Sequence, residues 1–171
     1  MRKFLLGFVF LFLIKTVCAD IVLTEVMYNP IQGSDTDLEW IEIYNNGTNS
    51  EDLSLWKIDG NTFDDFTISP GEFVVIAREL IDGTDLDNES FENIYGNGDG
   101  AWNSDDENFR AFDGDFSLTE LDTINITDGT YFEILNYNSS LGGNGNGFSI
   151  EKIEEKKEKS LDNWRESTVL F

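Results

Sequence analysis

The stretch LEWIEIYNNGTNSEDLSLWKIDG, residues 38–60, decides the fold class of this chain. Its first eight residues alternate with a period of two, and Asn46-Gly47 and Asp59-Gly60 are turn sequences. The pattern predicts short strands over residues 38–45 and 52–58. A chain that begins its ordered part in this way is expected to be built from β-strands and tight turns.

Two acids, Glu39 and Glu42, lie inside the first of these apolar runs. Strand parity places Glu39, Ile41, Ile43 and Asn45 on one face, and Leu38, Trp40, Glu42 and Tyr44 on the other. The two glutamates therefore point to opposite sides of the sheet and cannot form one glycosidase-type pair, whose carboxyls lie roughly 5–5.5 Å apart.

The same period of two continues along the chain. It predicts further strands at residues 21–28, 72–78, 109–118, 122–127, 131–137 and 148–153. In the first of them, parity groups Val22, Thr24, Val26 and Tyr28 against Ile21, Leu23, Glu25 and Met27. No long stretch has a helical apolar period, so about nine short strands predict a β-sandwich or barrel.

Residues 79–108 differ from the strands around them, because they are acidic and rich in Gly and Asn. We expect mostly a long loop there, with room for one helical turn near Leu80 or Phe91. The predicted organisation is one domain over residues 20–165, followed by a short tail at 166–171.

The N-terminal segment has the composition of a secretory signal peptide. Arg2 and Lys3 precede an apolar run over residues 4–14, and small residues lead to a cleavage site after Ala19. This run is too short for a bilayer span, which needs roughly 20 apolar residues. We therefore expect residues 1–19 to be removed and the protein to be secreted or held at the cell surface.

The charge of the chain disfavours anionic partners. Cleavage after Ala19 would remove three basic residues and no acid, leaving 8 basic and 34 acidic residues and a formal charge of −26. Such a surface repels nucleic-acid phosphates and anionic lipids, so nucleic-acid binding is not expected.

Missing residue types exclude several kinds of active site. The chain has no His, and its single Cys, Cys18, lies in the expected signal peptide. Ser-His-Asp and Cys-His nucleophilic sites and His-based zinc or copper sites are therefore excluded. The mature domain would also fold without a disulfide.

Several stretches, taken in order, resemble the lamin tail domain family. They are IVLTEVMYNP (21–30), LEWIEIYNNG (38–47), DLSLWKIDG (52–60), ISPGEFVVIA (68–77), LDTINITDGTYFEILNY (121–137) and GNGFSIEK (145–152) followed by Asn163-Trp164. The resemblance covers roughly residues 20–165. It departs from the family pattern at Leu55, where a Gly is common, and at Glu133-Ile134, where an Asp is common. The resemblance implies an immunoglobulin-like β-sandwich.

The resemblance also marks a set of signature residues, namely Glu25, Asn29, Glu39, Trp40, Glu42, Asn45 and Trp56. Since the family includes proteins of different function, the resemblance implies that these residues support the fold. We expect their glutamates to accept backbone N–H bonds from neighbouring loops. The alternative is a carboxylate pair or cation site formed by Glu25 and Glu42, if their strands are neighbours.

Acidic clusters are candidate Ca²⁺ ligands, because Ca²⁺ takes six to eight oxygen ligands. Asp82, Asp85 and Asp87, followed by Glu89, are the main candidates; the others are Asp35, Asp37 and Glu39, and Asp99, Asp105, Asp106 and Glu107. No cluster matches the EF-hand loop, and the alternative is a solvated acidic surface. No other cofactor is expected.

Aromatic residues could form a binding platform, since Trp40, Trp56, Trp102, Phe109 and Tyr137 are all large enough. We expect Trp40 and Trp56 in the core, and Trp102, in the Gly-rich acidic loop, as the exposed binding candidate. Four sequons are possible glycan sites: Asn46, Asn88, Asn125 and Asn138. Asn125 is the poorest acceptor, because it lies in a predicted strand.

The function expected from these observations is a non-enzymatic extracellular or cell-surface module that binds a protein, a polymer or its own kind. The alternative is a carboxylate–metal hydrolase of phosphoesters or glycosides, or an accessory domain of one. A divalent ion held by carboxylates converging in a cleft would favour the alternative.

Overall fold

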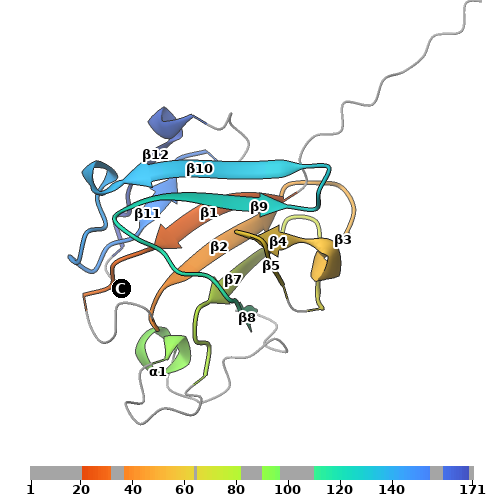
Figure 1. Ribbon diagram of the computed structural model, residues 1–171, viewed down its shortest axis with the longest axis horizontal. Helices are drawn as coiled ribbons and strands as arrows, with labels where there is room; N and C mark the ends of the chain where they lie inside the picture. The colour runs from red at the N-terminus through yellow and green to blue at the C-terminus, as the bar shows by residue number, and fades with distance from the viewer. Residues whose placement is uncertain are drawn as a thin grey trace, which may run out of the picture.

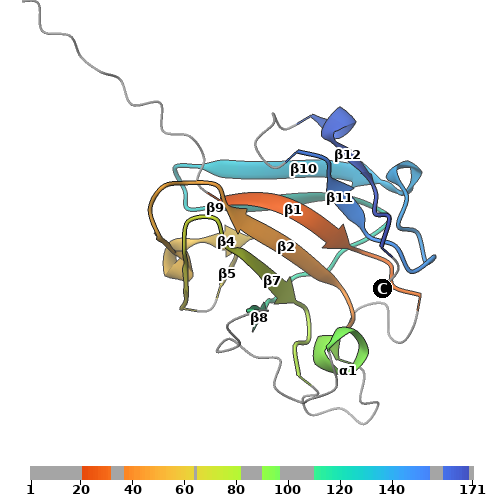
Figure 2. The ribbon, with the colours of Figure 1, turned by 180° about the vertical axis from the view of Figure 1, so that it is seen from behind.

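The computed structural model describes residues 21–31, 37–63, 65–81, 90–96, 110–154 and 160–169. They form a β-sandwich, whose main layers are seen from opposite sides in Figures 1 and 2. One layer is a six-stranded sheet in the order β12 (Trp164–Glu166), β11 (Ile150–Lys152), β1 (Ile21–Met27), β2 (Trp40–Asn45), β7 (Phe73–Ala77) and β8 (Ala111–Asp113). The other is a four-stranded sheet in the order β10 (Phe132–Asn138), β9 (Leu121–Thr127), β4 (Lys57–Ile58) and β5 (Asn61–Thr62).

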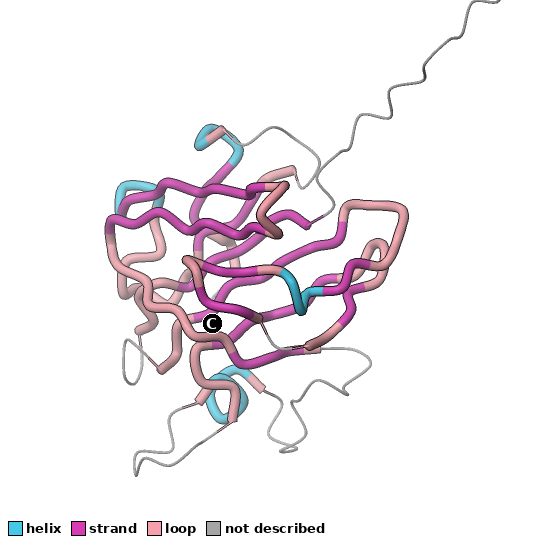
Figure 3. Tube along the Cα trace, turned by 45° about the vertical axis from the view of Figure 1, so that its right-hand side comes forward, coloured by secondary structure: helices cyan, strands magenta, loops and turns pink. Residues whose placement is uncertain are grey.

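The remaining elements are short. A two-stranded sheet pairs β3 (Glu51–Asp52) with β6 (Thr67–Ile68), and one α-helix, α1, spans Phe91–Tyr95. Figure 3 shows how strands and loops make up most of the trace. Among the described strands, all pairs are antiparallel except β7 with β8, which is parallel. The described part of the chain has twelve strands, several of two or three residues, where about nine were expected. The all-β sandwich prediction is confirmed.

The core lies between the two main sheets. Ile41 and Ile43 of β2 are fully buried there, together with Ile124 and Ile126 of β9. Trp40 lies on the opposite face of β2, in a second apolar cluster. The parity predicted for residues 38–45 is confirmed, and this alternation fixes which face of the six-stranded sheet meets the core.

The predicted parity of β1 is wrong beyond Leu23. A register shift places Leu23 opposite Ile43 but Glu25 opposite Glu42, so Thr24 is an extra residue in the ladder. This β-bulge inverts the alternation, and Val26 faces the inter-sheet core together with Leu23. The pattern of residue types in β1 could not reveal the bulge, because Thr24 suits either face.

The predicted strand over residues 52–58 is also wrong, because a 3-10 turn at Leu53–Leu55 interrupts it. The Asp52 carboxylate accepts the Ser54 backbone N–H at 3.0 Å and caps this turn. The turn carries the chain from β3 to β4, burying Leu53 and exposing Leu55. The Asp59-Gly60 turn behaves as predicted and joins β4 to β5, with both residues at positive φ.

Helix α1 lies at the end of the six-stranded sheet where β2 begins (Figure 1), and it packs against Trp40 and its apolar neighbours. The Trp40 ring packs edge-on against Phe91 and Tyr95, with ring centroids 6.0 and 6.2 Å apart. The helical turn considered near Phe91 is therefore present, and the core role of Trp40 is confirmed, although beneath α1. Trp56 packs in the inter-sheet core, as predicted.

The C-terminal strands complete the six-stranded sheet. β11 confirms the strand predicted within residues 148–153, and β12 pairs with it. Glu166, which we placed in the tail, belongs to β12, and the Ser167 backbone N–H continues the pairing to the Ser149 carbonyl at 2.9 Å. Among the described residues, none of the helices has the length and apolar character needed to cross a bilayer.

Candidate functional site

Glu39 supports the fold. Its side chain is buried, and Oε2 accepts the backbone N–H of Leu118 at 2.8 Å. A charged acceptor of this kind satisfies a donor that would otherwise be buried without a partner. The expected backbone bond from a neighbouring segment is thus observed for Glu39.

The two signature asparagines hold turns. Asn45 is fully buried, and its Nδ2 donates to the carbonyls of Asn49 at 2.8 Å and Ile68 at 3.0 Å. Asn29 donates through Nδ2 to the Asn144 side chain at 2.6 Å. The Asn45 amide ties β2 to the loop at Asn49 and to β6, and the Asn29 amide ties the turn after β1 to the loop at Asn144.

Glu25 and Glu42 lie side by side, as a carboxylate pair or cation site formed by these two residues would require. The ladder pairs Glu25 with Glu42 on one side and with Glu151 on the other. We call Glu151, Glu25 and Glu42 the carboxylate row; it crosses β11, β1 and β2. The row lies away from the inter-sheet core, because the neighbours of Glu42 along β2, Ile41 and Ile43, point into that core.

Hydroxyl groups and one guanidinium bond to the carboxylate row. Ser149 donates to Glu25, and Thr24, the bulge residue, donates to Glu42 Oε1 at 2.8 Å. Arg165 binds Glu151 through Nε at 2.8 Å and Nη2 at 2.7 Å. We expected these glutamates to accept backbone N–H groups, but the bonds named above come from side-chain donors.

Burial shifts the pKa of Glu25, the central residue of the row. Desolvation raises the pKa of Glu25 from 4.5 to about 7, the Ser149 hydroxyl opposes the shift, and the charges of Glu42 and Glu151 add to it. Within the described ranges, no group of three or more His, Cys, Asp or Glu side chains has an arrangement that could hold a metal ion.

A buried ion pair lies between the sheets, at the other side of the molecule from α1. Lys152 Nζ of β11 is 3.1 Å from Glu133 Oε1 of β10, and both side chains are almost fully buried. The Tyr131 hydroxyl donates to Glu133 Oε2 at 3.1 Å, and the Lys152 ammonium lies 6.0 Å from the Trp164 ring centroid. Glu133, at which the chain departs from the family pattern, is thus paired with Lys152 of β11.

The outer face of the four-stranded sheet carries no acid on its two long strands. The outward residues of β9 and β10 are Leu121, Thr123, Asn125, Thr127, Phe132, Ile134, Asn136 and Asn138. Lys57 of β4 is exposed beside them, opposite Thr127. We call these nine residues the acid-free face. The chain as a whole has a net charge of −23, so a face without acids stands out from its composition.

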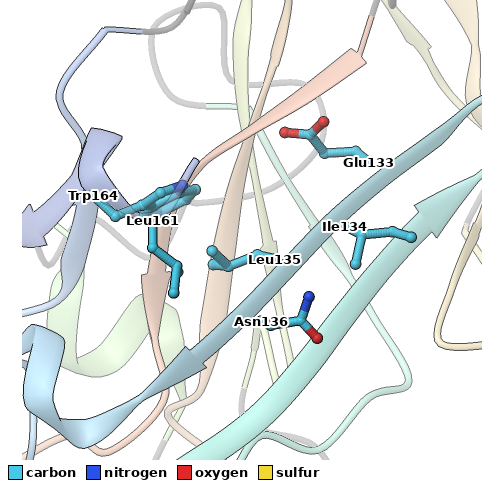
Figure 4. Close-up of a pocket in the computed structure, with 6 residues that line it drawn as sticks. All are labelled: Glu133, Ile134, Leu135, Asn136, Leu161 and Trp164. Atoms are coloured by element: carbon cyan, nitrogen blue, oxygen red, sulfur yellow. The ribbon is translucent and has the colours of Figure 1, made fainter. Parts of the chain in front are cut away.

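A small cavity opens beside the acid-free face (Figure 4). Its volume is about 120 Å³, and it is lined by Glu133, Ile134, Leu135, Asn136, Leu161 and Trp164. A shallower hollow of about 340 Å³ shares Asn136 and Leu161 with it and is also lined by Leu121, Asp122, Thr123, Tyr137 and Asn138. We call the two hollows together the furrow, because residues of β10 line both of them.

Several predicted site residues lie outside the described residues. These are the binding candidate Trp102, the calcium candidates Asp82, Asp85 and Asp87, and also Asp35, Asn88, Glu89, Asp99, Asp105, Asp106, Glu107 and Phe109. Of the described sequons, Asn125 lies in β9 as predicted and Asn138 ends β10. Tyr137, considered for a platform, is buried in the core.

Sequence reasoning missed the Glu133–Lys152 pair and the acid-free face. Parity could have found both, because Glu133 alternates with Leu135 and Tyr137 on the inward side of its strand. The same parity leaves only uncharged residues on the outward side. The cavity had no comparable signal, since Leu161 and Trp164 come from a distant segment.

The chain matches the family model described as Lamin Tail Domain over residues 15–139. The match covers more than half of the chain, which therefore belongs to the lamin tail domain family and has its immunoglobulin-like sandwich fold. β11 and β12 follow the matched span, so Glu151 and Lys152 lie outside it. No curated protein and no solved structure matches the chain.

Proposed function

We propose that this protein is an exported, non-enzymatic module that binds a protein, a surface polymer or another copy of itself through the acid-free face. The observation that carries the proposal is the contrast between the net charge of −23 and the two central strands that present no acid. Exposed Leu121, Phe132 and Ile134 supply apolar area on this face. Uncharged side chains around apolar ones are typical of recognition surfaces.

Export is supported by the N-terminal sequence, where a basic pair, a short apolar run and small residues precede Ala19. A binding role without catalysis is supported by the hydrogen bonds that the signature glutamates make within the fold. Glu39 satisfies the Leu118 N–H, and Glu42 accepts the Thr24 hydroxyl. These carboxylates serve the packing of strands and loops.

The test uses residues 20–171 as bait for surface extracts of the cells that make the protein, with and without Ca²⁺. Two variants carry one new acid each at an exposed apolar residue: Ile134→Asp on the acid-free face and Leu55→Asp on the turn between β3 and β4. We expect the wild type and Leu55→Asp to retain the same protein or polymer and Ile134→Asp to lose it. Equal retention by all three proteins, or none by the wild type, would refute the proposal.

Two further roles stay predictions. If Asp82, Asp85 and Asp87 bind Ca²⁺, a chelator should lower the melting temperature of the protein. An unchanged melting temperature would exclude this Ca²⁺ site. Trp102→Ala would weaken binding without changing the melt if Trp102 contacts the ligand. A large loss of stability would instead place Trp102 in the core.

A further inference from the structure

We propose that β10 and the cavity beside it form a docking site for an extended peptide of a partner protein, which inserts one apolar side chain into the cavity and carries no acidic residue near it. This inference rests on the proposed function and specifies its partner. The partner would lie along the furrow between β10 and the segment that holds Leu161 and Trp164.

The position of β10 suits strand addition. It is the outermost strand of the four-stranded sheet, and in the part of the chain described its only ladder is with β9. A strand at a sheet edge presents backbone donors and acceptors along one side. An extended peptide can bind these groups, and its alternate side chains then enter pockets on either side of the strand.

The cavity supplies one such pocket. Leu135 and Trp164 are buried at its base, whereas Ile134 and Leu161 are 42% and 44% exposed. An apolar cavity of about 150 Å³ holds a benzene molecule. A volume of about 120 Å³ therefore suits a single branched aliphatic side chain, such as Leu, Ile or Val.

The acid that lines the cavity does not oppose an apolar anchor. Glu133 is held by Lys152 Nζ at 3.1 Å and by the Tyr131 hydroxyl at 3.1 Å. Since both carboxylate oxygens already accept hydrogen bonds, the anchor side chain does not have to satisfy them. The pair also prevents the cavity from carrying a net negative charge.

Charge complementarity defines the rest of the peptide. Asp122 lines the furrow, Asp128 is exposed in the turn before β10, and Glu120 is exposed next to Leu121, which pairs with the last residue of β10. A peptide with an uncharged centre and Lys or Arg near its ends would meet acids at both ends. The overall charge of −23 would speed its association and make binding weaken with salt.

A second copy of the chain is a poorer occupant. Two copies would bring two charges of −23 together, and the acids at the ends of each furrow would oppose each other. A partner peptide without acids avoids both repulsions. Self-association through the same face is therefore an outcome that the test must detect.

The test is selection of random decapeptides displayed on phage against residues 20–171. We expect enriched peptides to share one Leu, Ile, Val or Met between uncharged residues, to carry Lys or Arg toward the ends and to lack Asp and Glu. Synthetic copies should bind the wild type and the control Leu55→Asp equally. They should bind Ile134→Asp and the cavity-filling Leu161→Trp at least about tenfold more weakly.

Both test variants replace exposed side chains, and equal melting temperatures would show that they fold. The inference fails if no peptide is enriched above background, or if the enriched peptides bind Leu161→Trp as well as the wild type. It also fails if the wild type is a dimer in sedimentation and Ile134→Asp is a monomer, since the face then binds a second copy. In each case, surface material that is still captured by the wild type and lost by Ile134→Asp would leave the proposed function standing.

Discussion

The two outer faces of this sandwich differ in how many acidic side chains their strands present. The six-stranded sheet places three glutamates next to one another in the carboxylate row, with Arg165 at one end. The four-stranded sheet keeps acids off the outward side of β9 and β10, and its one inward glutamate on these strands, Glu133, is neutralised by Lys152. The comparison shows that a very acidic chain can gather carboxylates on one outer face and leave the two long strands of the other without an outward acid.

The largest expected effect comes from the ion pair under the acid-free face. Glu133→Ala would leave the Lys152 ammonium buried without its carboxylate, and we expect a loss of about 3–5 kcal/mol in the free energy of unfolding. The double variant Glu133→Leu with Lys152→Met should recover most of this loss, because it removes both charges together. Chemical denaturation measures both variants. A loss below about 1 kcal/mol for Glu133→Ala would show that the pair is not needed to keep this face in place.

The next effect comes from the carboxylate row and depends on pH. The pKa of Glu25 rises from 4.5 to about 7 in the folded protein, so between these values the native state holds a proton that the unfolded chain releases. The stability from this group is complete below pH 4.5 and is lost as pH rises through 7.

Glu25→Gln should therefore stabilise the protein at pH 8 and change little at pH 4.5. The full shift corresponds to roughly 3 kcal/mol, which partial exposure of the carboxyl reduces to about 2 kcal/mol. The difference in unfolding free energy between variant and wild type, measured from pH 4 to 8, isolates Glu25 from the other acids. A difference that does not vary with pH would show that Glu25 has an ordinary pKa.

A smaller effect is expected at the end of the carboxylate row. Arg165→Met removes the cation from Glu151, and we expect a loss of up to about 1 kcal/mol because the ion pair is exposed. The uncompensated Glu151 charge should also raise the pKa of Glu25 further. The pH profile of Arg165→Met would then move to higher pH than that of the wild type. An unmoved profile would show that Arg165 does not influence the row.

The smallest effect on stability is expected on the acid-free face. Ile134→Asp should change the free energy of unfolding by no more than about 0.5 kcal/mol, because the residue is exposed and outside the core. Thermal denaturation at low and high salt checks this. A larger loss would mean that Ile134 stabilises the fold and that its exposure does not indicate a binding role.

Parts of the fold followed directly from the sequence. The opposite faces of Glu39 and Glu42, the Asp59-Gly60 turn and the strands β9 and β10 were predicted from alternation and turn residues alone. These features depend on residues close together in the chain. The bulge at Thr24 and the 3-10 turn at Leu53–Leu55 were not predicted. At both places the side chains suit a regular strand as well as the observed conformation, so the residue pattern does not distinguish the two.

The candidate sites depended less on local pattern. Sequence parity left open whether Glu25 meets Glu42, and the pairing of β1 with β2 answered it. Glu151 joins them from a strand more than a hundred residues away in the sequence, which no spacing rule predicts. The cavity likewise combines Leu135 with Leu161 and Trp164 across the open side of the sandwich.

By itself, the sequence determined that this chain is an acidic β-sandwich without histidine chemistry, because composition and the period of two are local properties. Only the tertiary structure decided which carboxylates are neighbours and that burial raises the pKa of Glu25. Register between distant strands sets these relations, since the same alternating side chains can meet different neighbours in different registers.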